Sequence, residues 1–366
     1  MSNKAGREKV PVELFGLQIL RGFAATAVVA SHILRISDTV AGRFSPYWLT
    51  LSLSSGVDIF FVISGFIMFY ATFARGGPTI APGEFMLRRV VRIYPFYWFC
   101  CLALMALVAT HIFKARVFAI GEVLQSMALV PGHHSLIDMS WTLSYEMFFY
   151  LVFAATLTVR SKRVTVIATS AFIVAAYVVG NLVPDGPVRS FLGGSVVLEF
   201  CFGLGLAYVT VGRSGAVRVP WPLLALALAL IAVAPVFVPH PTVVFLAEPY
   251  RAVVWGLPAI VVVAAFLALK PARGFAARWL VSLGDASYAV YLTHLFVVIA
   301  YSKALQVPMI AHTNQILVAP LAIATSLVVG LIAHYVVEKP LLRSSRNLVR
   351  VIGLSRSTAA PVVFRT

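Results

Sequence analysis

The chain has 366 residues, of which 60% are hydrophobic and only 11% are charged, against roughly a quarter charged in an ordinary soluble domain. This composition excludes a soluble globular protein. The 29 Lys and Arg residues outnumber the 13 Asp and Glu residues, so the formal net charge is +16. A basic nucleic-acid-binding protein is excluded as well, because its cations would lie on a polar chain and not among long aliphatic runs. The combination predicts a multi-pass membrane protein with basic loops.

Apolar windows long enough to span a membrane recur along the chain. A spanning helix needs roughly 20 mainly apolar residues, and about ten such windows are separated by polar, Pro- or Gly-containing breaks. We therefore predict an all-α polytopic membrane protein of about ten transmembrane helices, with no separate soluble domain. A stretch in the longest connection, 118–130, is too short to span and is predicted to be an interfacial or re-entrant helix. The ten windows are 15–34, 52–73, 94–112, 141–159, 164–182, 193–211, 221–238, 251–269, 286–302 and 315–336.

The distribution of positive charge predicts the orientation of these spans. With ten spans, 21 of the 29 Lys and Arg residues fall in the two ends of the chain and the loops on their side of the membrane. Seven fall in the opposite loops, Arg251 among them. Cytoplasmic loops are the ones enriched in cations, so both termini are expected in the cytoplasm. The predicted organisation is a cytoplasmic segment at 1–14, a transmembrane domain at 15–340 and a basic cytoplasmic tail at 341–366.

Several residue types that often mark metal or nucleotide sites receive a simpler interpretation here. The three cysteines lie within apolar runs at no metal-ligand spacing, which predicts reduced core residues and no metal site. Gly203-Leu204-Gly205 follows no strand, so close helix packing is favoured over nucleotide binding. His133 and His134 are predicted to be solvated loop residues. The cysteines are Cys100, Cys101 and Cys201.

Seven ionisable residues fall in the interior of the predicted spans, away from the first and last two residues of each span. Such groups cost several kcal/mol in a bilayer and are usually retained where they face a cavity and take part in function. Arg21 and His32 are eleven residues apart, which turns a helix about 20° beyond three full turns and places both on one face about 16 Å apart. Glu199 and His334 are predicted to make packing or polar interhelical contacts. The full set is Arg21, His32, Asp58, Glu146, Glu199, His294 and His334.

Three of these groups share one depth in the predicted membrane. His32 lies near the outer end of its span, and Asp58 and Glu146 lie about as deep in theirs. A carboxylate beside an imidazole orients the ring and fixes its tautomer, as a general base for a hydroxyl requires. The sequence therefore predicts that His32 meets Asp58 and Glu146 in a catalytic cluster. The alternative is a structural polar cluster that holds three helices together.

Three arginines gather where the third span begins. Arg88, Arg89 and Arg92 lie within two helical turns, and Arg89 and Arg92 are three residues apart on one face. Guanidinium groups form forked hydrogen bonds to phosphate oxygens, so the cluster suits an anionic cofactor such as coenzyme A. Ordinary anchoring to acidic lipid headgroups is the alternative, and spacing alone favours it.

Six stretches, in order along the chain, resemble the membrane-bound acyltransferase family 3, and within it the exopolysaccharide acetyltransferases of rhizobia and their relatives. The resemblance implies ten helices and transfer of an acyl group, usually acetyl from cytoplasmic acetyl-CoA, to a hydroxyl of a surface or exported carbohydrate. It implies that His32 and Arg21 are essential and that Arg89 and Arg92 hold the cofactor. The stretches are Leu17–Gly22 followed by His32, Gly56–Phe66, Arg88–Pro95, Ser140–Tyr150, Ser287–His294 and Val337–Pro340.

The resemblance also implies the partners and the location of the protein. We expect an acyl-CoA donor, a carbohydrate acceptor, the lipid bilayer of the bacterial cytoplasmic membrane and polysaccharide biosynthesis or export machinery, with no nucleic acid. His32 is expected to deprotonate the acceptor hydroxyl, with a covalent acyl-histidine as the variant mechanism. Arg21 is expected to stabilise the oxyanion or to hold the pantetheine arm. The alternative functions are a transporter or flippase of a sugar or lipid-linked glycan, and a structural scaffold for an export complex.

Overall fold

The computed structural model describes residues 12–42, 45–74, 80–110, 118–131, 135–211, 217–237 and 250–351, and every regular element in these ranges is helical. Two π-helical turns, Ala252–Gly256 and His334–Glu338, interrupt the α-helices. The α-helices are α1 Val12–Val40, α2 Tyr47–Ser54, α3 Gly56–Phe73, α4 Pro82–Ala109, α5 Ile120–Met127, α6 Trp141–Thr156, α7 Lys162–Leu182, α8 Pro187–Leu192, α9 Glu199–Thr210, α10 Trp221–Val233, α11 Leu257–Leu267, α12 Phe275–Asp285, α13 Ser287–Ala304, α14 Pro308–Ala311, α15 Gln315–Ala333 and α16 Lys339–Val351.

Six helical segments in the described ranges are long and apolar enough to cross a membrane, and α12 with α13, bent by 72°, makes a seventh if the pair is counted as one span. Each of them overlaps one of the predicted windows, which confirms a multi-pass membrane protein. Three shorter apolar helices occupy the other three windows, at Ser195–Thr210, Trp221–Phe237 and Ala252–Leu267. Because these three are shorter than the roughly 20 residues of a full span, the count of ten stays a prediction. The six long segments are Leu14–Val40, Tyr47–Phe73, Pro82–Ala109, Asp138–Val159, Lys162–Leu182 and Gln315–Val349.

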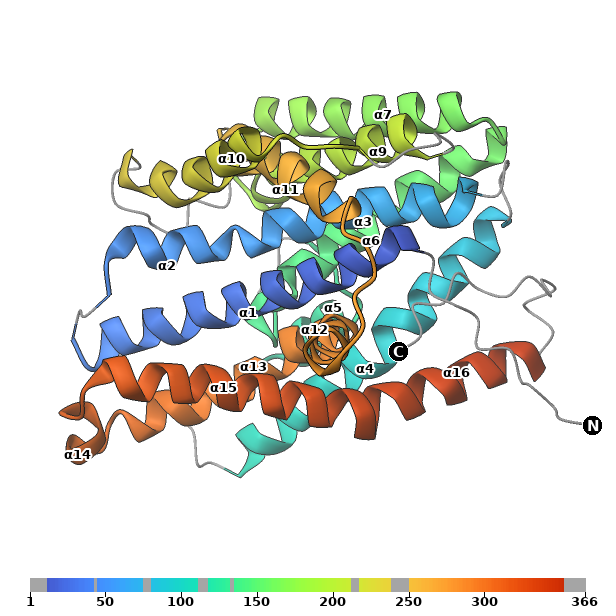
Figure 1. The fold of residues 1–366 in the computed structure, drawn as a ribbon. Helices are drawn as coiled ribbons and strands as arrows, with labels where there is room; N and C mark the ends of the chain where they lie inside the picture. The colour runs from blue at the N-terminus through green and yellow to red at the C-terminus, as the bar shows by residue number, and fades with distance from the viewer. Residues whose placement is uncertain are drawn as a thin grey trace, which may run out of the picture.

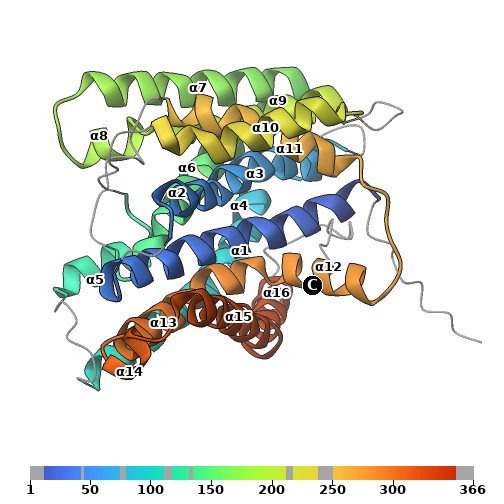
Figure 2. The same cartoon turned by 60° about the vertical axis from the view of Figure 1, so that its left-hand side comes forward.

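Helix α1 runs through the middle of the bundle. It packs against helices on both of its sides, among them α3 and α11 on one side and α12, α13 and α15 on the other. Helices α7, α9, α10 and α11 form an outer layer beyond α3, whereas α15 and α16 lie at the opposite surface (Figures 1 and 2). The start of α1 and the end of α16 lie at the same end of the bundle, with α14 at the other end (Figure 1). Side chains that face inward from α1 are therefore surrounded by protein.

A glycine allows α9 to approach α3 closely. A Cβ atom on Gly203 of α9 would lie 2.0 Å from the backbone oxygen of Val62 on α3. Small residues let membrane helices approach at van der Waals distance, where packing replaces the hydrophobic effect as the source of stability. The predicted packing role is confirmed for Gly203 but is wrong for Gly205, where an added Cβ would meet nothing within 4 Å.

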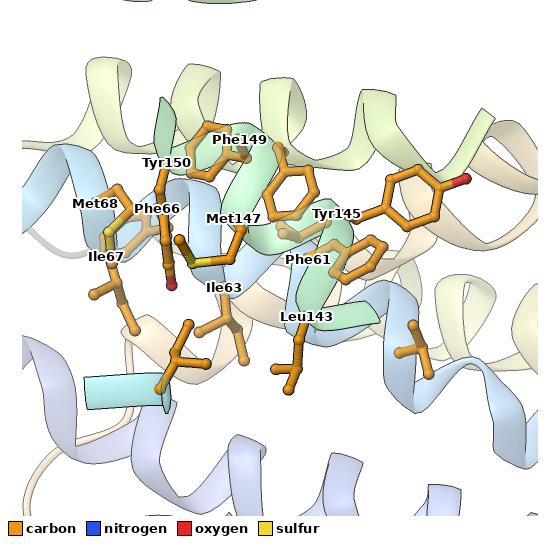
Figure 3. Packing of buried hydrophobic residues seen from close by; sticks show 14 of the residues in the cluster. Phe61, Ile63, Phe66, Ile67, Met68, Leu143, Tyr145, Met147, Phe149 and Tyr150 are labelled. Carbon is orange, nitrogen blue, oxygen red and sulfur yellow. The ribbon is translucent and has the colours of Figure 1, made fainter. Parts of the chain in front are cut away.

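Aromatic side chains fill the core between α3, α6 and α9. The ring of Phe200 stacks on Phe61 at 4.6 Å and on Phe149 at 4.5 Å between centroids, and the aromatic residues of α3 and α6 interleave along the contact (Figure 3). Offset ring pairs of this kind add to the energy of area burial. Cys100 and Cys101 on α4 are buried and unbridged, as predicted, whereas Cys201 on α9 is unbridged but only half-buried.

Two predicted segments have a defined local structure. Helix α5 occupies the connection in which a short helix was expected, and the hydroxyl of Tyr97 ties it to α4 by donating to the Ser126 backbone oxygen at 2.8 Å. Its position relative to a membrane stays a prediction. The predicted tail begins as helix, because α16 continues the last span to Val351. Residues 1–11, most of the predicted N-terminal segment, and the end of the tail at 352–366 lie outside the described residues, as do His133 and His134.

Candidate active site

Two histidines from distant parts of the chain meet inside the bundle. His32 Nδ1 on α1 lies 3.1 Å from His294 Nε2 on α13, and the two rings stack at 5.1 Å between centroids. His294 is fully buried, and its Nδ1 lies 3.3 Å from the backbone oxygen of Val290, one turn earlier on α13. The pair exists because α1 and α13 pack directly against each other.

The surrounding backbone decides where the protons of this pair lie. A carbonyl oxygen only accepts, so we assign the proton of His294 to Nδ1, which donates to Val290. His294 Nε2 then accepts a hydrogen bond from Nδ1 of His32. The assignment leaves Nε2 of His32 with an unshared electron pair, as a general base or nucleophile requires.

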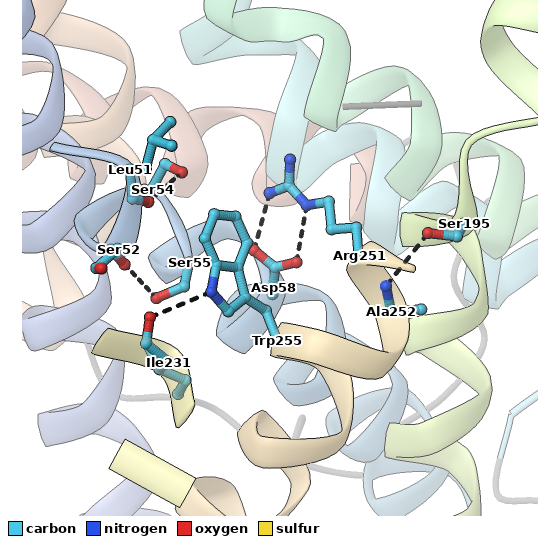
Figure 4. A network of polar contacts seen from close by, with 10 residues as sticks. All are labelled: Leu51, Ser52, Ser54, Ser55, Asp58, Ser195, Ile231, Arg251, Ala252 and Trp255. Atoms are coloured by element: carbon cyan, nitrogen blue, oxygen red, sulfur yellow. Dashed lines mark hydrogen bonds and ion pairs between the residues drawn. The ribbon is translucent and has the colours of Figure 1, made fainter. Parts of the chain in front are cut away.

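Asp58 does not join this pair. Its carboxylate is fully buried and accepts two hydrogen bonds from Arg251, from Nε at 2.9 Å and from Nη2 at 2.8 Å (Figure 4). The prediction that Asp58 contacts His32, made from their equal depth in the membrane, is wrong. Asp58 faces the π-helical turn before α11, whereas His32 lies on α1. Glu199, also fully buried, lies beside the ion pair.

The same contact corrects the prediction for Arg251. The charge count placed it in an outer loop, but only 1% of its surface is exposed and its guanidinium also lies 5.3 Å from the Trp255 ring (Figure 4). Its position at the very edge of an apolar window concealed this role. The pairing could have been predicted from the sequence. Asp58 and Arg251 carry opposite charges within apolar windows, and charged residues inside a membrane usually pair with one another.

Glu146 lies toward the Arg21 end of the site. Its carboxylate accepts hydrogen bonds from the hydroxyls of Ser64, at 3.1 Å, and Tyr150, and it is within electrostatic range of Arg21 and Arg89. The predicted contact of Glu146 with His32 is absent from the hydrogen bonds of the described residues. Ser64 and Tyr150 hold this carboxylate instead, so the prediction that it orients the imidazole is not supported.

Arg21 sits among charges contributed by several helices. Its Nη1 donates to Gln18 at 3.3 Å, and Arg92, Asp285 and Glu338 also lie within electrostatic range. Asp285 ends α12 at the 72° bend before α13. This bend carries the backbone of α12 against α1, so that residues far apart in the sequence surround Arg21.

Two of the three predicted phosphate ligands are engaged in ion pairs within the protein. Arg88 pairs with Glu84 at 2.6 Å, one turn earlier on α4, and Arg92 pairs with Glu338. The other oxygen of Glu338 contacts His334 Nδ1 at 2.6 Å, so the polar contact of His334 is made within its own π-helical turn and not between helices.

Arg89 differs from its two neighbours. Its guanidinium lies 5.5 Å from the Phe85 ring and 5.8 Å from the Tyr150 ring, and its Nε has no hydrogen-bond partner among the described residues. Aromatic faces attract a guanidinium without neutralising its charge. Arg89 is therefore the member of the cluster best able to accept an anionic ligand from within the bundle. The part of the chain that the structure describes contains no group of three His, Cys, Asp or Glu side chains placed to hold a metal ion.

Comparison with known proteins assigns most of the chain to one family. Residues 14–335 match the acyltransferase domain family, and this range contains the histidine pair and the three arginines of α4. No solved structure matches the chain significantly.

Two curated relatives match over most of their length. The exopolysaccharide production protein ExoZ of Rhizobium meliloti is 31% identical over 318 residues, covering 84% of this chain and 95% of that protein. The acyltransferase MdmB of Streptomyces mycarofaciens is 28% identical, covering 91% of this chain and 92% of that protein. The chain therefore belongs to the acyltransferase family whose domain occupies residues 14–335.

Proposed function

We propose that this membrane acyltransferase transfers acetyl from cytoplasmic acetyl-CoA to a hydroxyl of an exported or surface polysaccharide, in the cytoplasmic membrane of a bacterium. The observation that carries the proposal is the His32–His294 pair, which leaves one imidazole nitrogen inside the bundle free to accept a proton. The polysaccharide acceptor is supported by the similarity to a protein named for exopolysaccharide production.

The proposed chemistry is a single acyl transfer. His32 Nε2 takes the proton of the acceptor hydroxyl while the hydroxyl oxygen attacks the thioester carbonyl. The carbon–sulfur bond then breaks, and the proton held by His32 passes to the departing thiolate, so that an ester and a free thiol are formed. His294 keeps the His32 proton on Nδ1 throughout and acts as a positioning residue. In the variant mechanism, the same His32 nitrogen first accepts the acetyl group.

Arg21 lies on the same face of α1 as His32, about three helical turns earlier. A guanidinium there can stabilise the negative charge that develops on the thioester oxygen, or it can hold the amides of the pantetheine arm. Arg89 and Arg92 lie beyond it, on the side from which a cytoplasmic donor would enter. The charges from Arg89 to Arg21 and the imidazole of His32 would thus form one path for the donor.

The proposal is tested with purified protein in an uncharged detergent, given radiolabelled acetyl-CoA and a chemically deacetylated bacterial exopolysaccharide. We expect alkali-labile label on the polysaccharide, with release of free coenzyme A. A transporter or flippase would leave the label on coenzyme A. Acetyl-CoA that stays intact with a panel of deacetylated glycans would contradict the proposed donor and reaction.

A further inference from the structure

The last helix is too long to lie wholly within a membrane. Helices α15 and α16 continue through the π-helical turn from Gln315 to Val349, a segment of 35 residues. At 1.5 Å per residue it is about 52 Å long, whereas the hydrocarbon core of a bilayer is about 30 Å thick. The apolar residues are concentrated in α15, so α16 is the part that extends beyond the core. It does so at the end of the bundle where α1 begins (Figure 1).

A stripe of cations follows one side of α16. Lys339, Arg343 and Arg346 are spaced by four and three residues, which confines them to an arc of about 60° around the helix. Arg343 and Arg346 are exposed. Leu342, about 40° beyond Arg346 around the helix, is buried, and α16 packs along α4. We call Lys339, Arg343 and Arg346 the α16 stripe.

The α16 stripe adds exposed positive charge beside the α4 cluster. Arg88 and Arg92 of that cluster are each paired with a glutamate, Glu84 and Glu338. The side chains of Arg343 and Arg346 are exposed, and no acidic residue occurs within α16 itself, over 339–351. Phosphates at the surface of the bundle can therefore reach several cations of α16 at once.

The stripe also begins at the buried site. The charge of Lys339 acts on Asp285, which lies in the group of charges around Arg21. From Lys339 the stripe runs outward for about 10 Å to Arg346. A ligand whose thioester lies near Arg21 can thus place a distal anionic group beside α16.

We propose that the α16 stripe binds the phosphate groups of the nucleotide part of the acyl donor, while Arg89 and Arg21 receive the inner part. This rests on the proposed function, since it concerns the same donor. Acidic lipid headgroups carry the same phosphate chemistry, but the stripe begins at the buried charges of the site, which favours the donor.

The test compares coenzyme A with pantetheine, which lacks the nucleotide and its phosphates, as ligands of the detergent-solubilised protein. Isothermal titration would give both affinities for wild type and for R343Q/R346Q. The matched control is K162Q/R163Q, which removes two cations from the start of α7. We expect coenzyme A to bind R343Q/R346Q about three- to tenfold more weakly, the effect of losing two exposed charge contacts. Pantetheine should bind wild type and variant equally, and the control variant should match wild type.

The possible outcomes separate this inference from the proposed function. If coenzyme A binds wild type and R343Q/R346Q equally, the inference is wrong while the proposed function stands. The inference is equally wrong if R343Q/R346Q binds coenzyme A normally and only loses affinity for vesicles containing phosphatidylglycerol, since the stripe would then serve lipids. If wild type binds neither ligand, the proposed donor itself is wrong.

Discussion

The partner of His32 decides which of its nitrogens can react. Nε2 of neutral His294 accepts a hydrogen bond from Nδ1 of His32. It thereby keeps the His32 proton on Nδ1, although His294 itself carries no charge. The partner need only be an acceptor in the right place, and this requirement can be separated from the imidazole itself.

Substitutions of His294 test that requirement. Glutamine can place its side-chain oxygen near the position of Nε2, whereas leucine offers no acceptor. We expect H294Q to keep most of the activity and H294L to lose roughly 10²- to 10⁴-fold in kcat, the usual contribution of a general base. The KM for acetyl-CoA should change little in either variant. Equal losses in H294Q and H294L would contradict the positioning role, because they would show that only the size or ring of the side chain matters.

Asp58 forms a buried ion pair with Arg251 and does not orient His32, the role that its sequence position suggested. Removing one partner of a buried ion pair leaves an uncompensated charge and costs about 3–5 kcal/mol. We therefore expect D58N to lower the thermal stability of the protein in detergent. The double variant D58L/R251M, which removes both charges, should recover much of that loss. Wild-type stability in D58N, combined with loss of transfer, would instead place Asp58 in the chemistry.

At the scale of the helices, backbone contacts locate the site. A Cβ atom added to Gly284 of α12 would lie 1.8 Å from the Gln18 backbone oxygen on α1, so the two helices are in backbone contact here. This contact, just before the bend between α12 and α13, places Asp285 near Arg21 and aligns α13 so that His294 reaches His32. The bend is thus the element that joins the two halves of the site.

The contact of α3 with α9 gives a sharp test of the packing. In G203A the added Cβ would meet the Val62 oxygen at 2.0 Å, and forcing such overlap in a packed interior costs about 1–3 kcal/mol. The neighbouring G205A meets nothing within 4 Å. We expect G203A to unfold at a clearly lower temperature than wild type and G205A to match wild type. Identical unfolding of the two variants would contradict the helix contact.

At the scale of the whole molecule, the sequence could predict what depends on one helix at a time. Hydropathy located every span-like segment, and the helical period placed Arg21 and His32 on one face of α1. The sequence could not predict how neighbouring helices are rotated about their own axes. Asp58 was therefore assigned to His32, although in the structure it faces Arg251. His294 was recognised as embedded, but its distance of 262 residues from His32 left no periodic pattern to connect them.

The orientation of the bundle in the membrane can be measured by labelling its two ends. Thr313, between α14 and α15, and Ser344 on α16 are exposed at opposite ends, and the described cysteines are not exposed. In T313C and S344C, a membrane-impermeant maleimide added to right-side-out vesicles should label T313C only. Inside-out vesicles should give the reverse. Labelling of S344C from outside would overturn the predicted cytoplasmic position of α16.

The role of His32 is tested most directly by the rate of labelled acetyl transfer from acetyl-CoA to a polysaccharide by H32A. The control is H312A, which changes an exposed histidine after α14. Both variants should insert and unfold like wild type, and we expect normal transfer by H312A and none above background by H32A. Transfer by folded H32A at the wild-type rate would show that the His32 imidazole does not carry the proton of the reaction.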